Sequence, residues 1–148
     1  MQPINILLVE DNLDHVDLVK DALLECNERN KVACVYNGDQ ALDYLATVQQ
    51  SPSTQAPDLI LLDLKMPRCN GISVLKALKA DPQYRKIPVI ILSTSANGAD
   101  VNVCYELGAN SFVTKPVDAE QFLQAIKEIN GYWVSTSKLP KGDLYPAG

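Results

Sequence analysis

The stretch LILLDLKMPRCNG, residues 59–71, places an aspartate directly after four apolar residues. An apolar run of this length is typical of a strand that is buried on both faces of a parallel sheet. Because burying an unpaired carboxylate costs free energy, the position of Asp63 has to be explained. Two explanations are open: Asp63 caps the following turn or helix, or it projects from the strand end into a functional cleft.

Similar β-rich runs occur along the whole chain and alternate with segments of helical periodicity. The expected strands are residues 4–9, 32–36, 59–63, 89–93 and 111–114, and the expected helices lie around 16–26, 41–45, 72–78, 101–107 and 118–129. A repeat of this kind predicts an α/β fold, with a parallel sheet and helices on both faces. Two segments fall outside the alternation: a polar loop over 48–58 and a tail over 131–148.

Length and composition restrict the class of protein. The 148 residues suit a single domain, and a net charge of −5 without a basic cluster disfavours a nucleic-acid partner. The longest apolar runs have about four residues, far below the roughly 18 needed to span a bilayer. We therefore expect no membrane segment and, without a secretory leader, a cytoplasmic protein.

Cysteine and histidine usage argues against a zinc site. Four scattered cysteines lack a C-x-x-C pair and accompany a single histidine, so we expect reduced thiols. Cys69 lies in the loop near Asp63, but no resolving cysteine is apparent beside it, and a redox role is disfavoured. His15 is expected on the surface of the first helix near the site, rather than as a phosphate carrier.

Polar side chains follow four of the five expected strands. They are Glu10 and Asp11 after the first, Asp63 at the end of the third, Ser93 and Thr94 at the fourth, and Lys115 after the fifth. In an open parallel sheet these strand ends meet at the edge where ligands bind. Taken singly, each has a structural explanation as a helix cap, a turn residue or a solvated charge.

Together, these residues suit phosphoryl transfer onto a carboxylate. Three clustered acids would repel one another, and a lysine and Mg²⁺ with oxygen ligands from Asp11, Asp63 and Glu10 would resolve that repulsion. Asp63 would accept the phosphoryl group, while Ser93 and Lys115 would bind its oxygens.

The motifs ILLVEDN, LILLDLKMPRCNG, PVIILSTSA and GANSFVTKPV resemble the receiver domain of two-component response regulators, over residues 4 to about 130. The D-x-x-M-P-x-x-x-G stretch from Asp63 and the Lys-Pro pair 22 residues beyond Ser93 follow the family pattern. The resemblance implies a flavodoxin-like (βα)5 receiver fold, doubly wound, with strand order 2-1-3-4-5. It also implies phosphate transfer from a sensor histidine kinase. We expect no output domain after the tail.

The resemblance also implies roles for particular residues. Asp63 would be the phosphoacceptor, Lys115 the phosphate partner and Ser93 the switch hydroxyl, which also binds the phosphate. Phe112 and Thr94 would be further switch residues. A divalent cation such as Mg²⁺ would bind Glu10, Asp11, Asp63 and the backbone carbonyl of Lys65. Two residues depart from the usual pattern: Glu10 replaces the more common aspartate, and Ser93 replaces the frequent threonine.

A narrower resemblance comes from VEDN, the Ser/Pro loop and the ending INGYWVSTSKLP, which look like single-domain regulators paired with cyanobacterial phytochrome kinases. It implies a phytochrome kinase as partner and a homodimer through the fourth helix, fifth strand, fifth helix and tail. Aromatic residues of these elements would form the interface: Tyr105, Phe112, Phe122, Tyr132 and Trp133. The alternative is that Phe122 and Trp133 complete the hydrophobic core.

Two other functions compete with a signalling role. An aspartate-nucleophile phosphatase on a similar core usually carries a second acid two residues after its nucleophile, where this chain has Lys65. A nucleotide or flavin site is disfavoured, because no G-x-G-x-x-G follows the first strand. We expect a signalling protein whose only catalysis is its own phosphorylation and dephosphorylation.

Overall fold

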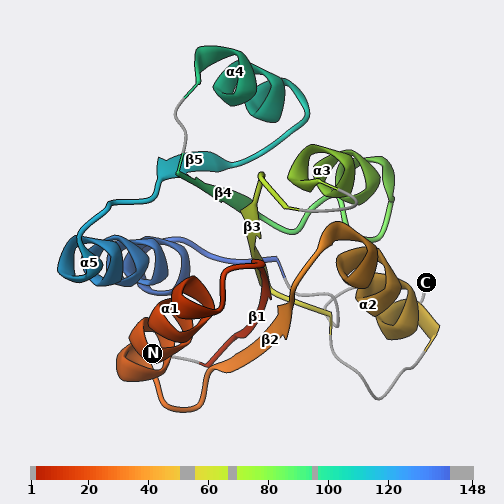
Figure 1. Ribbon diagram of the computed structural model, residues 1–148. Helices are drawn as coiled ribbons and strands as arrows, with labels where there is room; N and C mark the ends of the chain where they lie inside the picture. Colours follow the sequence, from red (N-terminus) through yellow and green to blue (C-terminus); the bar gives the residue numbers. More distant parts are fainter. Residues whose placement is uncertain (1–2, 51–55, 67–69, 95–96, 141–148) are drawn as a thin grey trace.

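The computed structural model describes residues 3–50, 56–66, 70–94 and 97–140, so Cys69 lies outside the described residues. Five parallel strands form one sheet in the order β2-β1-β3-β4-β5, which confirms the predicted doubly wound fold (Figure 1). The strands are β1 (Asn5–Val9), β2 (Lys31–Val35), β3 (Leu59–Asp63), β4 (Val89–Ser93) and β5 (Ser111–Thr114). The helices are α1 (Leu13–Cys26), α2 (Gly38–Gln50), α3 (Gly71–Ala80), α4 (Gly98–Glu106) and α5 (Ala119–Asn130), followed by a π-helix, η1 (Gly131–Thr136).

Alternation along the central strands divides the core between the two faces of the sheet. Ile60 and Leu62 of β3 pack into the cluster beneath α2, α3 and α4, whereas Leu59 and Leu61 pack into the cluster beneath α1 and α5. Figure 1 shows α1 and α5 together on one side of the sheet and α2 and α3 on the other. Because β3 is buried on both faces, it reads in sequence as a continuous apolar run.

The register of the sheet places the polar strand ends side by side. Val9 of β1 is paired with Leu62 of β3, and Asp63 is paired with Leu92 of β4. Glu10, which follows β1 directly, therefore lies beside Asp63. The order of the strands reverses between β1 and β3, the point at which open α/β sheets bind ligands.

Two asparagines, rather than the aspartates, cap the helices that follow β1 and β3. Asn12 Oδ1 accepts hydrogen bonds from the Asp14 and His15 amides at 3.0 and 3.2 Å. Asn70 caps α3 in the same way, accepting from the Ser73 amide at 3.1 Å. Helix capping therefore does not explain Asp11 or Asp63.

Two segments differ from the sequence expectation. Helix α2 continues through Val48 to Gln50, because Val48 is buried one turn beyond the last predicted residue, so residues 48–50 are helical and not part of the expected loop. Residues 51–55 of that expected loop lie outside the described residues. After α5, Trp133, Val134 and Leu139 pack against the α1/α5 cluster, in which Phe122 is also buried. Phe122 and Trp133 thus complete the core, the second of the two alternatives. Among the described helices, none has the length and apolar character needed to cross a membrane.

Candidate functional site

A glycine fixes the turn that follows Asp63. Asp63 is the last residue of β3 and only 6% exposed, and the Gly71 amide donates a hydrogen bond to the Leu64 carbonyl at 3.0 Å. A Cβ atom on Gly71 would lie 2.3 Å from the Asp63 carbonyl oxygen and 2.7 Å from Leu64 Cα, closer than such atoms can approach. The last residue of the D-x-x-M-P-x-x-x-G motif therefore permits the loop that holds Asp63.

Three carboxylates converge at this edge of the sheet. Oxygens of Glu10, Asp11 and Asp63 all lie within 4.8 Å of one another. Glu10 is almost completely buried, and its Oε2 accepts a hydrogen bond from the Asn12 amide at 3.2 Å. Asp11 is exposed, so the cluster has one side open to solvent.

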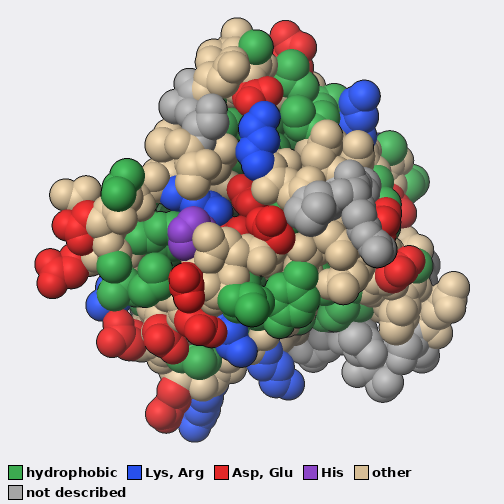
Figure 2. Space-filling model, in the orientation of Figure 1, with side chains coloured by type: hydrophobic (Ala, Val, Ile, Leu, Met, Phe, Trp, Pro, Cys, Tyr) green, Lys and Arg blue, Asp and Glu red, His purple; other side chains and the backbone are tan. Residues whose placement is uncertain are grey.

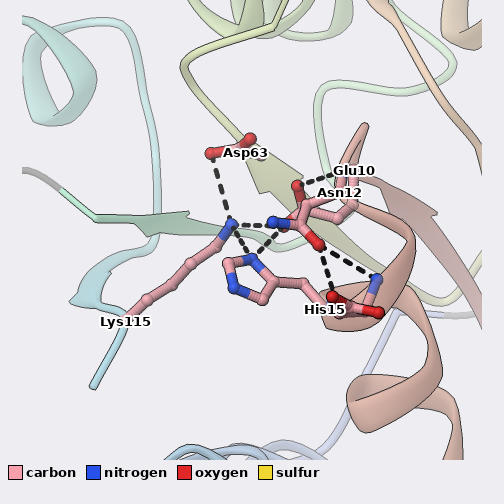
Figure 3. Close-up of polar contacts among 6 residues, drawn as sticks. Glu10, Asn12, His15, Asp63 and Lys115 are labelled. Carbon is pink, nitrogen blue, oxygen red and sulfur yellow. Dashed lines mark hydrogen bonds and ion pairs between the residues drawn. The ribbon is translucent and has the colours of Figure 1, made fainter. Parts of the chain in front are cut away.

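Lys115 places its ammonium among these acids. Its amide donates to the Ser93 carbonyl at 2.7 Å, which ties the end of β5 to β4. Lys115 Nζ forms an ion pair with Glu10 Oε1 and lies 3.6 Å from Asp63 Oδ1 (Figure 3). The side chain is only 3% exposed, so the alternative of a solvated charge is wrong.

The two buried carboxyl groups have opposite pKa shifts. Burial, followed by the charge of Glu10, raises the pKa of Asp63 to about 7, although Lys115 opposes the shift. For Glu10, burial raises the pKa, but the hydrogen bond and the charge of Lys115 outweigh it and leave the pKa below its ordinary value. The Lys115 ammonium thus stabilises the charged form of Glu10 more than the charged form of Asp63.

The donor set fits a hard divalent cation. Three carboxylate groups lie together, and Lys115 forms ion pairs with two of them, Glu10 and Asp63. Carboxylate oxygens are the ligands that Mg²⁺ and Mn²⁺ prefer. The exposed carboxylate of Asp11 leaves a route for entry. The backbone carbonyl of Lys65 stays a predicted ligand, and the Lys65 ammonium pairs with Asp100 of α4 at 3.2 Å.

The predicted switch residues occupy different environments. Ser93 is fully buried at the end of β4, whereas Thr94, the next residue, is exposed. Phe112 is half-buried in β5, and its amide donates a hydrogen bond to the Tyr105 hydroxyl of α4 at 3.1 Å. The structure therefore brings Ser93 beside Lys115 and connects Phe112 to α4.

His15 lies closer to the site than the sequence predicted. Its Nδ1 lies 3.1 Å from Lys115 Nζ and 3.7 Å from Glu10 Oε1 (Figure 3). Figure 2 shows this only histidine at the surface beside a group of acidic side chains. The available signal was position in the chain, since His15 lies four residues after Asp11, in the first turn of α1.

Comparisons with known proteins identify the family of this chain. The family model of the response regulator receiver domain matches residues 6–127. Response regulator Rcp1 of Synechocystis is 33% identical over 91% of this chain and 92% of its own length. The probable methanogenesis regulatory protein FilR2 of Methanothrix harundinacea is 33% identical over 93% of this chain and 88% of its own length.

Solved structures give the same result. The phosphorylated cyanobacterial phytochrome response regulator RcpA superposes with a TM-score of 0.89 at 38% identity, covering 95% of this chain and 100% of that one. The Mn²⁺-bound form of Rcp1 gives a TM-score of 0.86 at 33% identity, covering 93% and 99%. This chain therefore belongs to the response regulator receiver family and is related to the cyanobacterial phytochrome response regulators.

Proposed function

We propose that Asp63 accepts a phosphoryl group from the phosphohistidine of a sensor kinase. The observation that carries this proposal is the pairing of a buried carboxylate at the end of the central strand with Lys115 Nζ at 3.6 Å. Glu10 and Asp11 supply further oxygens within 4.8 Å. Such an assembly positions and neutralises an incoming phosphoryl group, which is most of what phosphoryl transfer requires.

In the proposed reaction, an Asp63 carboxylate oxygen attacks phosphorus in line with the bond from phosphorus to the donor's imidazole nitrogen. The P–O bond to Asp63 forms as the P–N bond breaks, and the donor histidine leaves with the electron pair. Lys115 turns one N–H toward a phosphoryl oxygen. A divalent cation held by Asp11, Asp63 and Glu10 would offset the charge of the phosphoryl oxygens when bound.

Phosphate incorporation from acetyl phosphate tests this proposal. We expect the wild-type chain to take up one phosphoryl group when Mg²⁺ is present and far less in EDTA. Asp63→Asn should abolish uptake, whereas Asp17→Asn, which changes an exposed aspartate of α1, should leave it unchanged. Uptake by Asp63→Asn at the wild-type rate would refute the assignment.

Phosphorylation is proposed to act on β4, β5 and α4. Ser93 is buried next to the site and its carbonyl binds the Lys115 amide, so movement of either residue reaches the β4–β5 pair. We propose that the Ser93 hydroxyl moves toward the phosphoryl group and that Thr94 and Phe112 rearrange with it. Amide NMR shifts induced by a phosphate mimic should then extend over residues 93–115, and shifts confined to the Asp63 loop would argue against the coupling.

The similarity to RcpA favours a phytochrome as the partner kinase, and the exposed apolar side chains favour a homodimer. Four of the seven large hydrophobic residues that are exposed in the described part of the chain lie on α4 or flank α5: Val103, Tyr105, Val117 and Tyr132. We propose that these elements, with β5, form the contact between two copies. A signalling role of this kind places the protein in the cytoplasm, with self-phosphorylation and self-dephosphorylation as its only catalysis.

Sedimentation measures whether the chain is a monomer or the proposed homodimer. Val103→Ser and Tyr132→Ser together should shift the chain toward monomer at micromolar concentration. Tyr36→Ser is the matched control, because Tyr36 is exposed next to β2 at the opposite edge of the sheet. A monomeric wild-type chain in both phosphorylation states would refute the homodimer.

A further inference from the structure

We propose that His15 is a positioning residue, which holds the Lys115 ammonium at the phosphorylation site through the lone pair of Nδ1. The inference rests on the proposed function of Asp63, because it assigns His15 a part in the same phosphoryl transfer. The two residues are 100 positions apart in the chain, and their nitrogens lie 3.1 Å apart.

The hydrogen-bond donors of the Lys115 ammonium determine the role of the His15 imidazole. A lysine ammonium has three N–H donors and no acceptor. Within the described part of the chain, three side-chain atoms face Lys115 Nζ: Glu10 Oε1, His15 Nδ1 at 3.1 Å and Asp63 Oδ1 at 3.6 Å. Because an ammonium can only donate, we infer that Nδ1 presents its lone pair and that Nε2 carries the ring proton.

Two contacts fix the position of His15. Its backbone amide donates to the capping side chain of Asn12 at 3.2 Å, which fixes the residue in the first turn of α1. The ring packs against Phe122 of α5, with 5.3 Å between centroids and 37° between planes. Phe122 is itself buried, so the imidazole packs against a fixed ring, and His15 Nδ1 points toward Lys115 Nζ.

This arrangement prepares Lys115 for the phosphoryl group. Asp63 Oδ1 lies farther from Lys115 Nζ than His15 Nδ1 does, so the N–H that faces Asp63 is the one most readily redirected to a phosphoryl oxygen. Glu10 and His15 retain the ammonium while that exchange takes place. A donor held in place before the reaction avoids reorganisation during it, which lowers the barrier.

Two substitutions separate this role from simple packing. His15→Asn keeps an acceptor, because the Asn Oδ1 is bonded to Cγ as His Nδ1 is. His15→Leu keeps an apolar side chain against Phe122 but removes the acceptor. Asp21→Leu is the matched control, since it places the same leucine at an exposed position of the same helix.

The first measurement is ¹⁵N NMR of the unphosphorylated protein at about pH 8, where a free imidazole is neutral. We expect an unprotonated Nδ1 in His15 and a slowly exchanging Lys115 ammonium signal. His15→Leu should broaden or lose that ammonium signal, while His15→Asn and Asp21→Leu retain it. A proton on Nδ1, or an ammonium signal unaffected by His15→Leu, would overturn the inference.

The second measurement is the rate of labelling by acetyl phosphate at saturating Mg²⁺. His15→Leu should be slower than wild type by about three- to tenfold, the loss expected for a hydrogen bond to a charged group that acts partly in the transition state. His15→Asn and Asp21→Leu should stay within about twofold of the wild type. Equal rates for wild type and His15→Leu would overturn the inference. A wild-type chain that takes up no phosphate would instead refute the proposed function. The NMR result would then test only the contact between His15 and Lys115.

Discussion

Asp63→Asn is expected to stabilise the protein against unfolding at alkaline pH when no divalent cation is bound. The wild-type carboxyl is buried beside Glu10 and Asp11, and this environment raises its pKa to about 7. An asparagine has nearly the same shape and carries no charge. The substitution therefore removes the repulsion that the folded protein meets when Asp63 ionises.

The sign and size of the effect follow from the pKa. An unfolded chain ionises Asp63 near pH 4, whereas the folded protein keeps the proton until about pH 7. The contribution of a raised pKa to stability is complete below the unfolded value and is lost as the pH rises through the folded value. Glu10, with a lowered pKa, exerts its own effect at more acidic pH.

Between about pH 5 and pH 8 the wild type should thus lose stability through Asp63. The full slope of 1.36 kcal/mol per pH unit applies only up to the folded pKa, so the two units from pH 5 to about pH 7 give an upper limit of about 2.7 kcal/mol. Because Asp63 shares its charge interactions with Glu10, we expect a loss of about 1 to 2 kcal/mol that is absent from Asp63→Asn.

Urea unfolding in EDTA, followed by the fluorescence of Trp133, measures this difference. Trp133 packs against the core, so its emission should report global unfolding. Asp17→Asn serves as the control for loss of an exposed aspartate. Equal pH dependence of the free energy of unfolding in wild type and Asp63→Asn, at constant m-value, would refute the electrostatic reasoning.

Other predictions concern Gly71, Asp11 and Lys115. Gly71→Ala should destabilise the protein by about 2 to 4 kcal/mol in urea unfolding, because its Cβ meets the Asp63 carbonyl at 2.3 Å. Gly98→Ala has open space and should be neutral or stabilising, and equal effects would contradict this explanation. Asp11→Asn should weaken Mg²⁺ binding by about tenfold or more in calorimetry, and wild-type affinity would exclude Asp11 as a ligand. Lys115→Met should destabilise the cation-free protein by about 2 to 4 kcal/mol, since buried carboxylates lose their ion-pair partner, and unchanged stability would show that the pair contributes nothing.

The fold could be predicted because its signals are local. Continuous apolar runs marked the strands, and helical spacing marked the segments between them. These two patterns predict a parallel sheet with helices on both faces, whereas the strand order was implied by the family resemblance. The convergence of Glu10, Asp63 and Lys115 followed from the rule that parallel strands end at the same edge.

The features that were missed depend on tertiary packing. The contact of His15 with Lys115 requires α1 and α5 to pack together and a long side chain to cross the site, which no local pattern records. Sequence likewise could not say whether Phe122 faces a partner or the core, since both environments favour an aromatic side chain. The extension of α2 to Gln50 was missed because the polar residues after Val48 lie on its exposed face.

Borohydride reduction after phosphorylation tests the central claim most directly. The reagent converts an aspartyl phosphate into homoserine and leaves free carboxylates unchanged, so peptide mass spectrometry identifies the acceptor. We predict homoserine at position 63, only after treatment with acetyl phosphate and Mg²⁺. Homoserine at another aspartate, or none at position 63 in a protein that has taken up phosphate, would contradict the assignment of Asp63.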